Sequence, residues 1–175
     1  MCKSAYLVAV MAAFIVSSCL SAGGVPRTIG FVDDTSDGQR SIGGAAEIVE
    51  FDMPGGCSRV NGIMLYGSRY GYPQAPVEDF TVTIAKADGS GAKVEKVPYG
   101  TIEWGNNKWY TITFEKPVKI RGKFLVAVDF NAQPTKGVYL SYDTSSGNAH
   151  SYVGSVTSKN LSEYGGEWMI KAMVQ

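Results

Sequence analysis

Histidine and cysteine are scarce in this sequence, and their scarcity excludes several kinds of site. His150 is the single histidine, and the three cysteines are Cys2, Cys19 and Cys57. Cys2 lies in the leader described below and Cys19 at its end, which leaves Cys57 as the one thiol of the folded domain. A disulfide within the domain is therefore excluded, and one histidine with one cysteine supplies too few ligands for a typical zinc site.

An excess of charge of one sign is lacking as well. The chain has 16 Lys and Arg against 16 Asp and Glu, and loss of Lys3 with the leader leaves 15 against 16, a net charge of −1. The sequence contains no cluster of basic residues, no internal repeat and no low-complexity tract. Nucleic-acid-binding proteins usually carry a concentrated positive charge. The composition therefore predicts no nucleic-acid partner.

The first residues have the order of an export signal. Lys3 supplies a positive charge, the uncharged apolar run Tyr6–Val16 follows, and Ser17 and Ser18 are small. The run is too short to cross a bilayer core of about 30 Å, which needs about 20 residues. We therefore expect residues 1–18 to be a signal peptide.

The end of this leader, Val16-Ser17-Ser18-Cys19, resembles the lipobox of bacterial lipoproteins. The resemblance implies that Cys19 is acylated and anchors the protein to a membrane. Two or three acyl chains would hold it there, because each buried CH₂ contributes about 0.8 kcal/mol. Leu20, rather than Asp, follows Cys19, which by the same resemblance implies the outer membrane rather than the inner one. The alternative is an ordinary cut after Ala22, although Leu20 then occupies a position that favours small residues.

Alternating apolar residues dominate the sequence from residue 45 onward. This period of two, with many β-branched and aromatic residues, is typical of strands with one buried face. The clearest examples are Phe80/Val82/Ile84, Tyr110/Ile112/Phe114 and Phe124/Val126/Val128/Phe130, and further strands are expected over 47–53, 60–66, 94–97, 138–142, 151–153 and 168–174. Turn residues separate them, and no helical period appears. The pattern predicts an all-β domain over 45–175, a two-sheet β-sandwich of jelly-roll type with eight or nine strands. Residues 19–44 are expected to hold the lipid-attachment site, a linker and a first loop.

A calcium site is one hypothesis for the acidic segment at 33–38. Asp33, Asp34 and Asp37 precede Gly38, which resembles the start of a calcium-binding loop. The twelfth position of such a loop requires a bidentate Glu, and here it is Gly44, so a helix–loop–helix site is excluded. The alternatives are a calcium ion held by a sandwich loop and a solvated turn without metal.

The segment 66–73 is the strongest candidate for ligand recognition. Arg69 lies among Tyr66, Tyr70 and Tyr72, and glycines bracket the group. Because it follows an expected strand, we expect a loop at one end of the sandwich. Aromatic faces beside hydrogen-bond donors suit sugar rings or peptide chains. The alternative is that the tyrosines cap the core.

A second polar segment, 143–152, contains Asp143 and His150. Neighbouring residues on an extended chain point to opposite faces, so His150 and Ser151 are not expected to form a base–nucleophile pair. No nucleophile-elbow motif is present. The segment is a candidate for ligand binding rather than for catalysis. Trp104, Trp109 and Trp168 are expected mainly to pack against the core.

Several motifs together resemble a bacterial exported β-sandwich domain over about residues 33–175. They are Ser36-Asp37-Gly38 with Arg40-Ser41-Ile42, Tyr66–Gly71, His150-Ser151-Tyr152 and Trp168–Ala172. The related domains occur as C-terminal modules beside larger exported partners such as peptidases. Their closing motif has Arg where this chain has Lys171, which puts an anion contact there in doubt. The resemblance implies an accessory or binding role and names no ligand.

Three functions follow from these observations. The leading interpretation is a non-enzymatic binding module, anchored at the bacterial cell surface, whose end loops bind a glycan or a protein. One alternative is a small exported hydrolase that uses His150 or a pair of carboxylates. The other is a purely structural envelope protein. A site would require some of these side chains to meet in one hollow: Arg69, Tyr66, Tyr70, Tyr72, Asp143 and His150.

Overall fold

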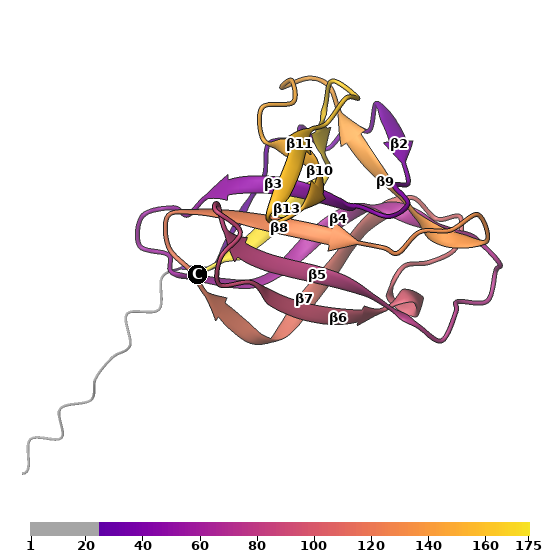
Figure 1. Ribbon diagram of the computed structural model, residues 1–175, viewed down its shortest axis with the longest axis horizontal. Coiled ribbons are helices and arrows are strands. Elements are labelled where there is room, and N and C mark those ends of the chain that lie inside the picture. Colours follow the sequence, from indigo (N-terminus) through magenta and orange to yellow (C-terminus); the bar gives the residue numbers. More distant parts are fainter. Residues whose placement is uncertain (1–24) are drawn as a thin grey trace, which may run out of the picture.

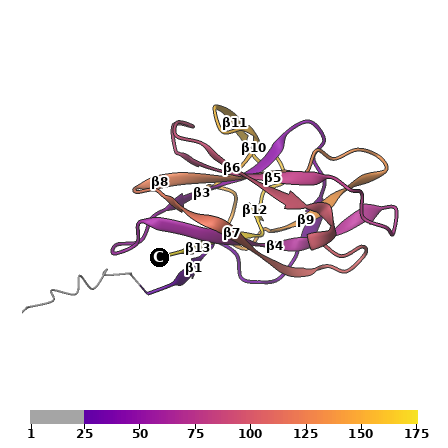
Figure 2. The same cartoon turned by 90° about the horizontal axis from the view of Figure 1, so that it is seen from below.

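The computed structural model describes residues 25–175, which form two antiparallel β-sheets packed face to face (Figures 1 and 2). The prediction of an all-β, two-sheet sandwich is confirmed, but the strands are more numerous and several are shorter than expected. They are β1 (Arg27–Ile29), β2 (Gly38–Arg40), β3 (Ala46–Asp52), β4 (Arg59–Gly71), β5 (Asp79–Lys86), β6 (Lys93–Pro98), β7 (Lys108–Lys119), β8 (Lys123–Asp129), β9 (Lys136–Asp143), β10 (Ser151–Ser155), β11 (Ser158–Leu161), β12 (Glu167–Trp168) and β13 (Ile170–Val174). A single 3-10 turn, η1 (Tyr99–Thr101), is the only helical element among the described residues.

Strand β4 forms the axis of the seven-stranded sheet. Its Ile63 lies opposite Ile112 of β7 on one side and opposite Ala172 of β13 on the other. Further along, Gly67 lies opposite Leu140 of β9. Strands β13 and β9 therefore follow one another along one side of β4, while β7 lies along the other. The six-stranded sheet has the order β11-β10-β3-β8-β5-β6.

Alternate residues of the strands fill the space between the sheets, as their period of two predicts. The core is mostly aliphatic and phenylalanine side chains, including Val49, Phe51, Ile63, Leu65, Phe80, Val82, Ile84, Ile112, Phe114, Phe124, Val126, Val128 and Phe130. Burial of this apolar surface is the main favourable term in the stability of the domain.

The outer face of β3 and β8 is not open to solvent, contrary to the expectation of one buried face. Leu125 and Ala127 are buried in a second apolar cluster, which Tyr152 and Val156 of the β10–β11 hairpin cover. The turn of this hairpin reaches the β5–β6 turn. A Cβ placed on Gly89 there would lie 2.5 Å from the carbonyl oxygen of Val156, so the close approach requires glycine.

The segment expected to be a linker contributes two strands to the domain. Strand β1 pairs with β13, and β2 pairs with β9. Three-residue strands are too short to show a period, which explains why the sequence did not reveal them. The predicted signal peptide and the predicted lipid-attachment residue Cys19 lie outside the described residues. Between residues 25 and 175, no helix is long and apolar enough to cross a membrane.

Candidate functional site

The segment predicted to be a recognition loop is mostly strand. Strand β4 continues to Gly71, because β9 pairs with residues 67–71 on one side and the chain at 103–105 bonds to Arg69 on the other. The loop prediction was therefore wrong for 66–71, and the loop begins at Tyr72. Gly71 adopts a φ of 87° where a Cβ would collide with the carbonyl oxygen of Thr135, which marks the sharp exit from the strand.

Arg69 is a structural residue, which the sequence did not indicate. Its side chain lies inside the sandwich end and is only 4% exposed. Its guanidinium donates to the carbonyl oxygens of Ile102 at 3.3 Å, Tyr72 at 2.6 Å and Pro73 at 2.5 Å. These bonds tie the loop after β4 to the segment before β7. Most of the donors that we expected to meet a ligand are therefore committed to the backbone.

The three tyrosines of the segment separate. Tyr66 lies on the outer face of its sheet, where its ring packs edge-on against Trp109 at a centroid distance of 5.4 Å. Tyr70 lies further along this face against Tyr139, at 4.5 Å, and donates to the carbonyl oxygen of Gln133 at 2.9 Å. Tyr72 lies beyond the strand and is 70% exposed.

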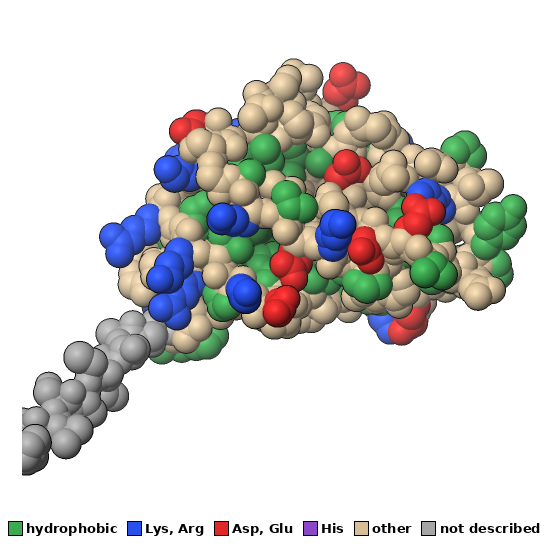
Figure 3. All heavy atoms as spheres, turned by 60° about the horizontal axis from the view of Figure 1, so that its bottom comes forward, with side chains coloured by type: hydrophobic (Ala, Val, Ile, Leu, Met, Phe, Trp, Pro, Cys, Tyr) green, Lys and Arg blue, Asp and Glu red, His purple; other side chains and the backbone are tan. Residues whose placement is uncertain are grey.

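Exposed aromatic side chains gather where β4 ends. Trp104 is 51% exposed and Tyr139 is 39% exposed, and the indole of Trp104 donates to the carbonyl oxygen of Gly71 at 2.9 Å. We call this region the aromatic end and define it by Tyr70, Tyr72, Trp104 and Tyr139. Figure 3 shows hydrophobic side chains protruding at the right-hand end of the molecule. Exposure of large aromatic groups to water is unfavourable, so their concentration in one place indicates a contact surface.

A hollow of about 240 Å³ opens beside Tyr70 and Tyr72. Its polar lining includes Gln74, Gln133, Thr135 and the ion pair between Lys136 and Glu78. This volume is below the roughly 300 Å³ at which enclosed small-molecule pockets begin. The arrangement is suited to one ring-sized group bound at the surface, with hydrogen-bond donors and acceptors around it.

Asp143 and His150 belong to a different place, so the candidate residues do not form one site. Asp143 is buried and accepts hydrogen bonds from the backbone N–H groups of Asp33 at 2.6 Å and Ser145 at 2.7 Å. Burial acts to raise the pKa of Asp143, but the hydrogen bonds from Ser145 and Asp33 outweigh it and leave the pKa below its usual value. The carboxylate thus holds two loops together.

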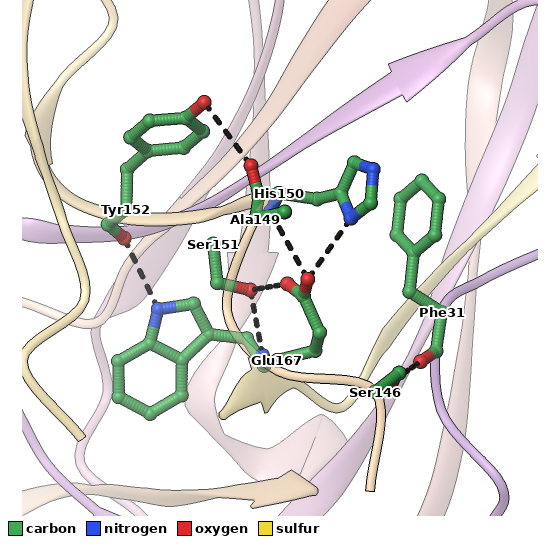
Figure 4. Close-up of polar contacts among 8 residues, drawn as sticks. Phe31, Ser146, Ala149, His150, Ser151, Tyr152 and Glu167 are labelled. Carbon is green, nitrogen blue, oxygen red and sulfur yellow. Dashed lines mark hydrogen bonds and ion pairs between the residues drawn. The ribbon is translucent and has the colours of Figure 1, made fainter. Parts of the chain in front are cut away.

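His150 is held by a carboxylate that the sequence did not single out, Glu167 of β12 (Figure 4). Glu167 is fully buried and accepts from the backbone N–H of His150 at 3.0 Å and from its Nδ1 at 2.9 Å. The ring of His150 also stacks on Phe31 at a centroid distance of 3.7 Å. Ser151 donates its hydroxyl to the other oxygen of Glu167 at 2.6 Å.

This geometry does not present an activated serine. The Ser151 hydroxyl is fully buried, donates to Glu167 and accepts from the backbone N–H of Trp168 at 2.8 Å. In a serine–histidine pair the hydroxyl bonds to the imidazole and is accessible to substrate, whereas here it bonds to the buried Glu167 and not to His150. His150 and Ser151 do reach one partner, because Glu167 lies between them. The hydrogen bonds of His150 and Ser151 with Glu167 and Trp168 thus connect the start of β10 to β12.

The three aspartates proposed to bind calcium engage separate partners. Asp33 accepts from the backbone N–H of Thr35 at 2.8 Å, and Asp34 pairs with Lys171. Asp37 accepts from the backbone N–H and the hydroxyl of Thr144 at 2.7 and 2.6 Å, and these bonds lower the pKa of Asp37. Within residues 25–175, no three His, Cys, Asp or Glu side chains are grouped so that they could hold a metal ion.

A further buried acid, Glu47, lies in the core on the interior face of β3. Its Oε1 accepts from the backbone N–H of Ile42 at 3.2 Å, and its Oε2 has no partner among the described residues. Burial raises the pKa of Glu47 well above its usual value, so the neutral acid is favoured. The sequence does not mark this residue, because β3 does not alternate strictly and therefore does not reveal which of Glu47 and Glu50 faces the core.

The fold is shared with part of a clostridial surface protein. The crystal structure of the cysteine protease and lectin-like domains of Cwp84, a surface layer associated protein of Clostridium difficile, matches with a TM-score of 0.61 and 12% identity, over 86% of this chain and 36% of that one. The clostridial cysteine protease Cwp84 after propeptide cleavage matches with a TM-score of 0.64 and 12% identity, over 86% of this chain and 40% of that one. This chain thus spans less than half the length of either match, and such low identity shows the fold alone. No family model and no curated protein matches this sequence.

Sequence reasoning missed most of the side chains around the aromatic end. Gln133 lies in the turn before β9 and Lys136 is the first residue of that strand, while Trp104 and Glu78 precede β7 and β5. Nothing links these positions in the sequence, because long-range pairing brings them together. Exposed aromatic residues next to turn glycines, such as Trp104 before Gly105, were the one available signal.

Proposed function

We propose that this protein is a non-enzymatic binding module of the bacterial cell surface that recognises a glycan through its aromatic end. The observation that carries the proposal is the exposure of Tyr72 and Trp104 in the segments that flank the end of β4, close to a polar hollow. Sugar rings present apolar faces and a rim of hydroxyl groups, which aromatic side chains and amide or charged groups complement. The likeness to a structure that contains lectin-like domains supports this choice of ligand.

A glycan and peptide array, read beside a thermal melt, tests the proposal. Changing Tyr72→Ala together with Trp104→Ala should weaken glycan capture by about thirtyfold or more, equivalent to about 2 kcal/mol, with little change in Tm. Leu161→Ala is the matched control, because Leu161 is 53% exposed in a different region and should leave capture unchanged. Capture of peptides alone, or equal loss in the control, would contradict the proposal.

The second part of the proposal concerns attachment: acylated Cys19 holds the module on the membrane. Its support is the lipobox-like sequence Val16–Cys19 at the end of the apolar run. Cys19→Ser should move the protein from the detergent-soluble membrane fraction into the soluble fraction. A wild-type protein that is already soluble and begins at Gly23 would show that the leader is cut in the ordinary way.

A further inference from the structure

The end of the sandwich opposite the aromatic end gathers six basic side chains from distant parts of the sequence. They line two adjoining grooves, and we call this region the cationic end: Arg59, Lys86, Lys93, Lys116, Lys119 and Arg121. Figure 3 shows Lys and Arg side chains concentrated at the left, near the start of the described chain. None of the six forms an ion pair with another residue of 25–175. Glu95 is the one carboxylate that lines either groove.

Two of these cations face each other directly. Arg59 at the start of β4 is the cross-strand partner of Lys119 at the end of β7, and both are exposed. Like charges directly opposite in a sheet destabilise the fold. Two opposed positive charges with no acidic side chain paired to them make this surface complementary to an external anion.

The groove between β6 and β7 adds an apolar component. It has a volume of about 410 Å³, and the buried core side chains of Val82, Ile84 and Phe114 form its floor. The half-buried Val118 lies at its wall beside Lys93 and Lys119. Val94, on its rim, is 60% exposed. Apolar surface directly beside cations matches an anionic amphiphile better than a fully soluble polyanion.

The chain also enters the domain at this end. Arg27 of β1 lies opposite Val174, which lies opposite Val60, and Val60 lies opposite Val118. The start of β1 is therefore level with Arg59 and Lys119. The six peptide units from Cys19 to Val25 reach at most about 20 Å when fully extended. A lipid on Cys19 would thus hold the cationic end within reach of the membrane surface.

We propose that the cationic end docks on an anionic phospholipid surface, with Arg59, Lys119 and Arg121 on headgroup phosphates and the β6–β7 groove against the acyl boundary. The orientation relative to the membrane rests on the proposed anchor at Cys19. Docking turns the aromatic end away from the membrane. Phosphate recognition by several Lys and Arg side chains is additive and falls with ionic strength.

Vesicle co-sedimentation of residues 20–175, which keep every strand of the domain, tests docking without the apolar leader and without the lipid. We expect binding to vesicles that contain phosphatidylglycerol, none to phosphatidylcholine alone, and release by salt. Lys119→Glu with Arg121→Glu should weaken binding by about tenfold or more. Arg40→Glu with Lys96→Glu changes the net charge by the same amount at exposed positions outside both grooves, and should leave binding nearly unchanged.

Several results would overturn the proposal. Equal loss in the two double variants would mean that total charge, not this surface, attracts the vesicles. Displacement by inorganic phosphate would assign the site to the free ion, and binding of double-stranded DNA without binding of vesicles would assign it to a polyanion. Lys119→Gln with Arg121→Gln repeats the test should the Glu variant fail to fold. Fractionation of wild type and Cys19→Ser reports on the anchor separately, so docking and anchoring can fail independently.

Discussion

At the cationic end six basic side chains reach solvent without an ion-pair partner among residues 25–175. At the aromatic end, by contrast, Arg69 of β4 is buried and bonded to three carbonyl oxygens. The two ends are about 40 Å apart along the thirteen residues of β4. One end therefore uses a cation to build its loops, and the other leaves its cations free. An arginine or lysine therefore indicates a binding site only where its hydrogen-bond donors are not already bonded to the backbone of the protein.

Both ends depend on the core between them, so we expect the largest loss of stability from a substitution that disrupts this core. Val128→Asp places a carboxylate among fully buried side chains and should cost several kcal/mol, against a total stability of about 5–15 kcal/mol. Thr111→Asp lies on the exposed face of β7 and should be tolerated. Urea unfolding of both variants checks this. Equal damage would contradict the assignment of interior and exterior faces.

The next largest effect breaks the aromatic end alone. Arg69→Ala leaves the buried carbonyl oxygen of Ile102 and the part-buried carbonyl oxygens of Tyr72 and Pro73 without their donor, and we expect a loss of about 2–4 kcal/mol. Glycan capture should fall in proportion to unfolding, while vesicle binding by the remaining folded protein should persist. Arg69→Lys is the control, because lysine keeps the charge but not the planar fork. An unchanged Tm for Arg69→Ala would refute the structural role.

A smaller effect concerns Glu47, the buried acid on the interior face of β3. Because the pKa of Glu47 is raised on folding, its favourable contribution is complete below the unfolded pKa of about 4.3 and is lost as pH rises through the folded value. Glu47→Gln stays neutral, so its stability should exceed that of wild type increasingly as the pH rises above about 4.3. Thermal melts across this pH range measure the difference. A constant difference at all pH values would contradict the assignment.

The smallest effect separates stability from function at the cationic end. Lys119→Glu replaces a repulsive cross-strand pair with an attractive one and should stabilise the fold by about 0.5 kcal/mol at low salt. The same change should weaken vesicle binding. Lys96→Glu is the control, since Lys96 is exposed and lies outside the grooves. A variant that loses stability and binding together would argue for a structural role of Lys119.

The sequence predicted the sandwich because its strands carry a simple alternation. Residues such as Phe80, Val82 and Ile84 are buried as expected, and the strand expected at 168–174 appears as β12 and β13, interrupted at Met169. The sequence did not predict the covered outer face at Leu125 and Ala127, because that burial depends on a hairpin far along the chain.

The sites were harder to predict than the fold, because they too depend on contacts between segments that are distant in the sequence. Arg69 looked like a ligand-binding residue because composition does not reveal which donors the backbone takes up. The six cations of the cationic end are scattered between residues 59 and 121, so the sequence shows no cluster where the fold makes one. Contacts between strands that are distant in sequence decide both cases.

The position of β1 has a mechanical consequence. Strand β1 runs along the same direction as β4 and begins at the cationic end, so a tension applied between a tether there and a ligand at the aromatic end acts along the strands. The hydrogen bonds of β1 with β13 lie across that direction and would be loaded together in shear, not opened one after another. In a module held at its amino end and pulled through its ligand, all the hydrogen bonds of β1 would therefore have to break together. Because β1 is short, its separation from β13 would be the first step of forced unfolding.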